Sequence, residues 1–73
     1  MKTEYYSREV RAVLNTLVEA SHEMRIMDLL EQAHVSLFVA PTVISRLLED
    51  KKIAFRMENN QQYFYAIKSG KRQ

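Results

Sequence analysis

The chain has 73 residues, of which 47% are hydrophobic and 27% are charged, and its formal net charge is +2. This length suits a single domain (residues 1–73), and the apolar share is that of a folded protein rather than of a disordered chain. The chain contains no cysteine, which excludes disulfides and thiolate metal sites.

The N-terminal part of the chain predicts an amphipathic helix over residues 7–20. Apolar residues recur there at the i, i+3, i+4, i+7 spacing, at Val10, Val13, Leu14, Leu17 and Val18. The first four residues, Met1-Lys2-Thr3-Glu4, lack the pattern of a signal peptide, and no apolar run reaches the ~18 residues of a membrane span. We therefore expect a cytoplasmic protein with no membrane segment, and its small size favours a prokaryotic or viral source.

A second helix is expected over residues 23–33. Ile26, Leu29, Leu30 and Ala33 form its apolar stripe. Ser21 is its candidate N-terminal cap, and Glu23 would then lie in the first turn, where the helix dipole favours an acid. The alternative is a start near Met27, which would leave residues 24–26 free to form a short strand.

A third helix is expected over residues 40–51. Pro41 fits its first position, where the missing N–H costs nothing. An earlier start at Ser36 is the alternative, and it would place Pro41 at a kink inside the helix. The helix has an apolar face and a polar face; Val43, Ile44, Leu47 and Leu48 form the first, and Thr42, Ser45, Arg46 and Glu49 form the second.

After Lys52 the apolar residues no longer recur at helical spacing but at every second position. Alternation over residues 53–57 and 63–67, on either side of the polar stretch 58–62, predicts a two-stranded hairpin over 53–67. Residues 68–73 form a basic tail, which we expect to be flexible. The predicted fold is therefore α+β, with three helices followed by a β-hairpin.

This order of elements resembles the winged-helix transcriptional regulators, and most closely their arsenical-repressor and multiple-antibiotic-resistance classes. Residues 29–36 resemble the end of the family's second helix with its turn, residues 47–53 the exit of its recognition helix, and residues 62–67 its returning wing strand. The chain departs from the family at the turn, where His34 replaces the usual glycine; histidine is among the residues enriched at positive φ. It departs again at the wing tip, which carries Asn and Gln instead of Arg and Lys.

The resemblance implies a sequence-specific protein that binds double-stranded DNA and regulates transcription in a phage, a plasmid or a bacterial chromosome. The third helix would lie in the major groove, where Thr42, Ser45, Arg46 and Glu49 would read base edges. The expected phosphate contacts are Arg25, Lys51, Lys52 and Arg56. The wing tip residues Asn59, Asn60, Gln61 and Gln62 would enter the minor groove. The alternative for each group is an ordinary solvated surface; it is the less favoured one for the polar face of the third helix and the more favoured one for Arg25 and the wing tip.

The sequence also indicates partners other than DNA. A chain this small has reason to form a homodimer, through Tyr5, Tyr6 and the first helix. The alternative function is a winged-helix module that binds a protein instead of DNA, because the connection after the second helix is unusually apolar at Leu37 and Phe38. His22 and His34 do not have the spacing of a metal site, and no catalytic constellation is visible, so we expect no cofactor, no metal and no enzyme activity.

Overall fold

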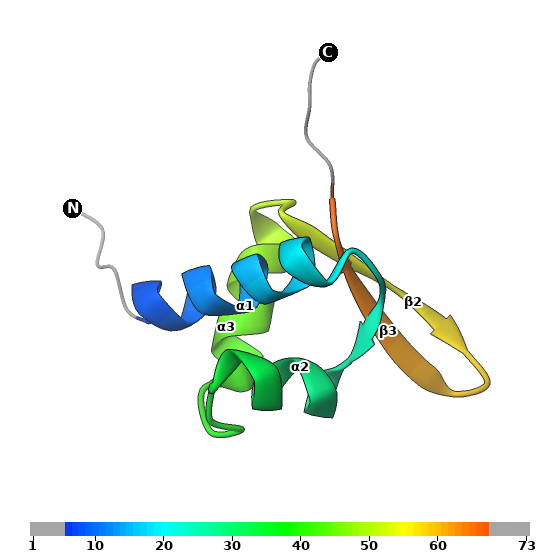
Figure 1. Ribbon diagram of the computed structural model, residues 1–73, viewed down its shortest axis with the longest axis horizontal. Coiled ribbons are helices and arrows are strands. Elements are labelled where there is room, and N and C mark those ends of the chain that lie inside the picture. Colours follow the sequence, from blue (N-terminus) through cyan, green and yellow to red (C-terminus); the bar gives the residue numbers. More distant parts are fainter. Residues whose placement is uncertain (1–5, 68–73) are drawn as a thin grey trace, which may run out of the picture.

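The computed structural model describes residues 6–67, which form three helices and three strands. The elements follow in the order α1 (Ser7–Ala20), β1 (Met24–Arg25), α2 (Ile26–Ala33), α3 (Ala40–Glu49), β2 (Ile53–Glu58) and β3 (Gln61–Ala66). Figure 1 shows the helices gathered together and the β2–β3 hairpin reaching out beyond them. This is a winged-helix-like α+β fold, which confirms the predicted class. The basic tail and Tyr5 lie outside the described residues.

The first helix has the predicted bounds, but the second does not. Ser21 ends α1 in a left-handed conformation (φ 60°) instead of capping a second helix. Residues 24 and 25 form β1, which pairs antiparallel with β3 through Met24↔Phe64 and Arg25↔Tyr63. The expected start at residue 23 is therefore wrong, and the alternative of a short strand before the helix is close to what the structure shows.

The alternation of Glu23, Met24 and Arg25 explains this start. Met24 is buried in the core, whereas Arg25 points to solvent. Side chains that alternate between core and solvent are the pattern of a strand. Pairing with β3 gives the backbone N–H and C=O groups of residues 24 and 25 hydrogen-bond partners, as a helix would have done. Glu23 consequently lies before β1, and the acidic residue in the first turn of α2 is Asp28.

The turn after α2 has the left-handed residue that the sequence predicts. His34 caps the helix at φ 59°, and the backbone N–H of Val35 donates to the carbonyl of Leu30. This is the arrangement that usually selects glycine. α3 then begins at Ala40, so Pro41 occupies its second position instead of its first, and the helix ends at Glu49, two residues before the expected end.

The hairpin is longer and its turn tighter than expected. β2 and β3 pair from Ile53↔Ala66 to Glu58↔Gln61, which leaves only Asn59 and Asn60 in the turn. Both residues have positive φ, 52° and 66°, as a two-residue turn of the primed type requires. The sheet order is β1-β3-β2, so β3 lies in the centre.

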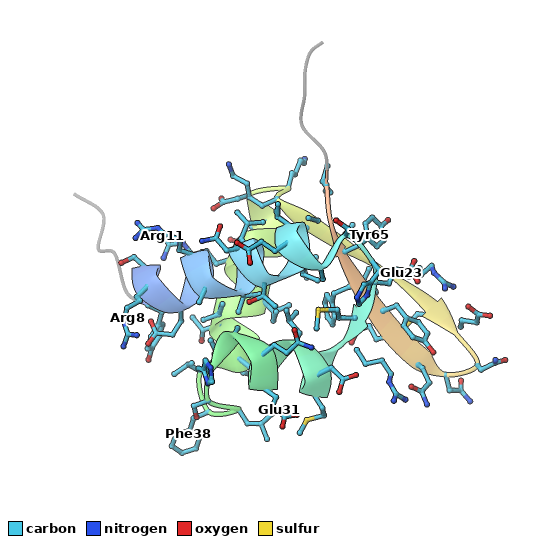
Figure 2. The ribbon with its side chains drawn as sticks, viewed as in Figure 1. Arg8, Arg11, Glu23, Glu31, Phe38 and Tyr65 are labelled. Atoms are coloured by element: carbon cyan, nitrogen blue, oxygen red, sulfur yellow. The ribbon has the colours of Figure 1, made fainter. Side chains whose placement is uncertain are left out.

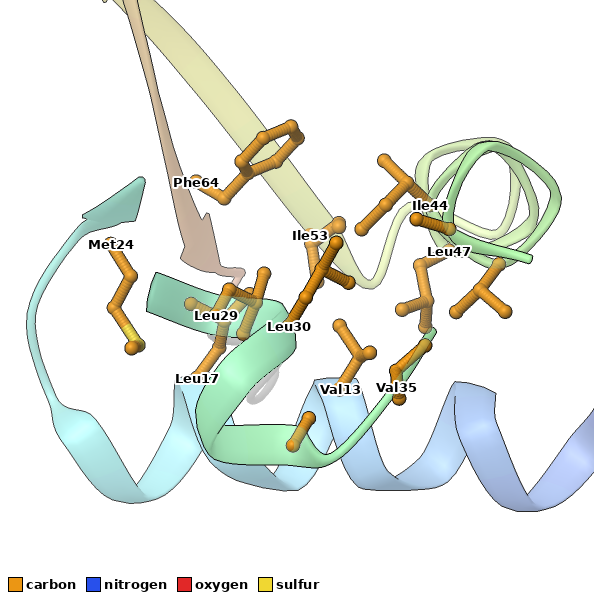
Figure 3. Close-up of a cluster of buried hydrophobic side chains, with 13 residues drawn as sticks. Val13, Leu17, Met24, Leu29, Leu30, Val35, Ile44, Leu47, Ile53 and Phe64 are labelled. Atoms are coloured by element: carbon orange, nitrogen blue, oxygen red, sulfur yellow. The ribbon is translucent and has the colours of Figure 1, made fainter. Parts of the chain in front are cut away.

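One apolar core joins the helices to the base of the hairpin (Figure 3). Its residues are Val13, Leu17, Met24, Leu29, Leu30, Ala33, Val35, Ala40, Val43, Ile44, Leu47, Ile53 and Phe64. Phe64 is 2% exposed and is the large side chain that β3 contributes, so it anchors the hairpin to the helices. None of the helices within residues 6–67 is long and apolar enough to cross a bilayer.

Candidate nucleic-acid interface

The polar face of α3 forms a shallow surface groove. Its lining consists of Pro41 and the four predicted base-reading residues, Thr42, Ser45, Arg46 and Glu49. They share one side because the opposite face of the helix, with Val43, Ile44 and Leu47, is buried in the core. Thr42, Ser45 and Glu49 are exposed and Arg46 is half-buried. The structure thus brings all four together on an open helix face that offers hydroxyl, guanidinium and carboxylate groups.

The two lysines predicted to contact phosphate follow directly after α3. Lys51 and Lys52 are both exposed. Lys51 has φ 59°, and the backbone N–H of Lys52 donates to the carbonyl of Leu47, so a tight turn presents the two side chains. The carbonyl of Lys52 accepts a hydrogen bond from Ile67 and so ties the turn to the end of β3. These cations stand at the base of the hairpin, beside the C-terminal end of the groove.

Arg56 has a different environment from the two lysines. Its Nε lies 2.6 Å from a carboxylate oxygen of Glu23, and it also forms an ion pair with Glu58. The guanidinium stacks over the ring of Tyr63, 5.1 Å from its centroid. Its hydrogen bonds to these carboxylates raise the pKa of Arg56, and the hydrogen bond from Arg56 lowers the pKa of Glu23. Arg56 therefore stays protonated, and two carboxylates of the protein balance its charge. We call the three residues Glu23, Arg56 and Glu58 the wing clamp.

Glu23 is the residue whose role the sequence interpretation missed. The sequence pattern predicts it in the first turn of a helix, whereas it stands before β1 (Figure 2) and its carboxylate accepts hydrogen bonds from Arg56 of β2. The signal was present in the alternation of Glu23, Met24 and Arg25, which favours a strand beside the hairpin. A strand there brings Glu23 next to the strand that carries Tyr63.

The hairpin tip is polar and uncharged, and it is held against β1. Asn59, Asn60 and Gln61 are exposed, and Gln62 is half-buried. An Arg25 guanidinium nitrogen donates to Oε1 of Gln61 at 2.8 Å. Arg25 is thus placed beside the tip, and its predicted phosphate contact would come from there and not from the turn after α3.

The charges of the described part of the chain nearly cancel. Residues 6–67 contain seven Lys and Arg and eight Asp and Glu, so the positive excess of the whole chain comes from residues outside this range. Within 6–67 there is also no group of three His, Cys, Asp or Glu side chains placed to hold a metal ion. His22 instead has its Nδ1 2.8 Å from the carbonyl oxygen of Glu23.

Comparison of the chain with protein-family models, with curated proteins and with solved structures finds no significant match.

Proposed function

We propose that this protein binds double-stranded DNA in a sequence-specific manner and regulates transcription. The observation that carries the proposal is the open groove on the polar face of α3, in a helix that follows α2 after the connection 34–39 and precedes a hairpin. A helix held by its apolar face and presenting hydrogen-bonding groups on the other is what the major groove accepts.

Arg46 is the principal base-reading residue in this proposal. Its guanidinium has the planar fork that matches the O6 and N7 acceptors of guanine. Thr42 lies one helical turn before Arg46 and Ser45 is adjacent to it, so both reach neighbouring bases or a phosphate. Glu49, at the far end of the groove, accepts from the amino group of cytosine.

Few phosphate contacts accompany this readout. Lys51 and Lys52 are exposed, Arg25 stands beside the hairpin tip, and Arg56 is already paired with carboxylates. Three phosphate contacts imply a slope of log K against log salt of about −3, which is shallow for a DNA-binding protein. Base contacts then account for a larger share of the affinity, which favours specific over non-specific binding.

A homodimer completes the proposal, since two copies would read two half-sites. Tyr6 at the start of α1 is 41% exposed and Val18 near its end is 55% exposed. An apolar cleft at the end of α1, lined by Leu17, Val18, Ala66 and Ile67 among others, extends this surface to β3. We propose that the second copy packs along α1.

The experiment that tests the function starts with selection of duplexes from a random pool by the wild-type protein. Fluorescence anisotropy then compares wild type, Arg46→Ala and Lys52→Ala on the selected site and on a scrambled duplex. Arg46→Ala should weaken only specific binding, by ~1–3 kcal/mol. Lys52→Ala should weaken both duplexes and flatten the salt slope by about one. Failure of the wild type to bind any duplex at ~50 mM salt, where phosphate contacts are strong, would refute the proposal.

A second candidate function, binding to a protein partner, is favoured by one observation. Leu37 is 61% exposed and Phe38 is 94% exposed in the turn between α2 and α3. Leu37→Ala and Phe38→Ala would then abolish capture of the partner while leaving the fold intact. Stable protein interfaces, however, bury ~800 Å² on each side. Two neighbouring side chains supply only part of that area, so DNA remains the better-supported partner.

A further inference from the structure

Phe38 is the most exposed large apolar side chain in the described part of the chain. Its exposed fraction is 94%, and Figure 2 shows it projecting from the turn between α2 and α3. A benzyl side chain in water forfeits the stabilisation that its burial would bring. Phe38 belongs neither to the core nor to the aromatic pair that Phe55 forms with Phe64. Folding alone does not account for a phenylalanine at this position.

The backbone holds Phe38 in this exposed position. Its own N–H donates to Oγ of Ser36 at 3.0 Å. On either side, Val39 N–H donates to the carbonyl of Ser36 and Ala40 N–H to that of Leu37. The turn is anchored in the core at both ends, by Val35 and by Ala40, which are both buried. Phe38 is therefore presented by a hydrogen-bonded turn and is not carried on an unpaired loop.

This turn leads directly into α3 and continues its polar face. The N–H groups of residues 39 and 40 donate to the carbonyls of residues 36 and 37 with the i→i+3 spacing of a 3₁₀ turn, and Val43 N–H then donates to the carbonyl of Val39. Counted along this helical path, Phe38 precedes Thr42 by four residues and Ser45 by seven. That spacing returns to the same face of a helix. This spacing places Phe38, two residues before α3, on the side of the helix that carries the groove lined by Thr42, Ser45 and Arg46, although Phe38 itself does not line the groove.

We propose that Phe38 contacts the C5-methyl group of a thymine in the major groove and so specifies one A·T pair of the target site. The inference rests on the proposed function. The thymine methyl is the apolar group that base pairs present in this groove, and phenylalanine is among the side chains that contact it. One turn of helix advances about 5.4 Å, against about 3.4 Å per base pair. The thymine therefore lies one or two base pairs from the base that Thr42 faces.

Replacement of thymine by deoxyuridine isolates this contact, because it removes the methyl group and keeps every hydrogen-bonding group. Each thymine of the selected site is replaced in turn, and anisotropy measures the Kd of wild type, Phe38→Ala and Leu37→Ala. At one thymine of each half-site, deoxyuridine should weaken wild-type binding about fourfold, the factor expected for one buried methyl-sized group. Phe38→Ala should bind the two duplexes equally, whereas Leu37→Ala should retain the wild-type ratio between them.

The outcomes separate this inference from the proposed function. The protein binds DNA but Phe38 does not read a methyl group if wild type binds its site and no deoxyuridine replacement changes its Kd. The same conclusion follows if deoxyuridine weakens the binding of Phe38→Ala as much as that of wild type. Unchanged DNA affinity in Phe38→Ala would likewise overturn it and would direct attention to a protein partner. If wild type binds no duplex, both proposals fail together. Circular dichroism of Phe38→Ala checks the fold, which should be intact because the side chain lies outside the core.

Discussion

The ion pairs of the wing clamp predict that two of the protein's own carboxylates lower its affinity for DNA. Glu23 and Glu58 occupy the guanidinium of Arg56, so Arg56 adds nothing to phosphate binding as long as both pairs persist. Replacing both acids, in Glu23→Gln/Glu58→Gln, keeps side-chain size and leaves Arg56 with uncharged neighbours. We expect the double variant to bind duplex DNA more tightly than wild type.

The magnitude follows from one additional phosphate contact. Such a contact steepens the slope of log K against log salt by about 0.9. Between ~50 and ~200 mM salt the affinity of the variant should therefore fall about 3.5-fold more than that of wild type. The gain should apply to selected and scrambled duplexes alike, because a phosphate contact carries no sequence information. The clamp would thus restrain non-specific binding.

Anisotropy titrations at four salt concentrations, with both duplexes, measure this slope. The matched control is Glu9→Gln/Glu19→Gln, which removes two carboxylates on α1 and changes net charge by the same amount. If the control steepens the salt slope as much as the clamp variant does, general charge is responsible and the reasoning about Arg56 is wrong. Thermal melts check the fold, and Tm should fall only slightly because the clamp consists of two exposed ion pairs.

Four further predictions concern the fold, its pH dependence and its assembly. His34→Gly should stabilise the protein by about 1 kcal/mol, measured by urea unfolding, because glycine adopts φ 59° without strain; His34→Val should destabilise it. Phe64→Ala should cost ~3–5 kcal/mol in the same assay, and a loss below ~1 kcal/mol would mean that the hairpin is not anchored through this ring. The pKa of Glu23 is lowered in the folded protein, so its pair with Arg56 stabilises the fold at pH values above the ordinary glutamate pKa. This stabilisation is lost as the pH falls through the pKa that Glu23 has in the folded state. Below pH ~4.5 the Tm of Glu23→Gln should therefore decline less on acidification than the Tm of wild type. Light scattering should give about twice the chain mass of 8.6 kDa, and Val18→Asp should restore the monomer mass if the second copy packs along α1; a wild-type monomer would contradict the dimer.

The elements of this fold could be predicted where local pattern and burial agree. The apolar stripe of α1 fixes its face, the positive φ of His34 was expected from its place in the turn, and the change of period at Ile53 predicts the hairpin. The same reasoning predicts that the four polar residues of the α3 groove lie together, because a helix with one buried face exposes its remaining residues on the opposite face. In each case residues close in the chain carry the whole signal.

Only the tertiary structure determined the features that depend on contacts between distant segments of the chain. β1 exists because a strand elsewhere in the chain, β3, accepts its backbone hydrogen bonds, so residues 24 and 25 read alone remain ambiguous between helix and strand. The same pairing brings together Arg25 and Gln61, which are 36 residues apart. Together with the pairing of β2 to β3 it also brings together Glu23 and Arg56, which are 33 residues apart. The sequence by itself shows which residues can be charged, apolar or left-handed. That Arg56 pairs with Glu23 depends on a contact between residues far apart in the sequence, and no periodicity within one segment can carry that information.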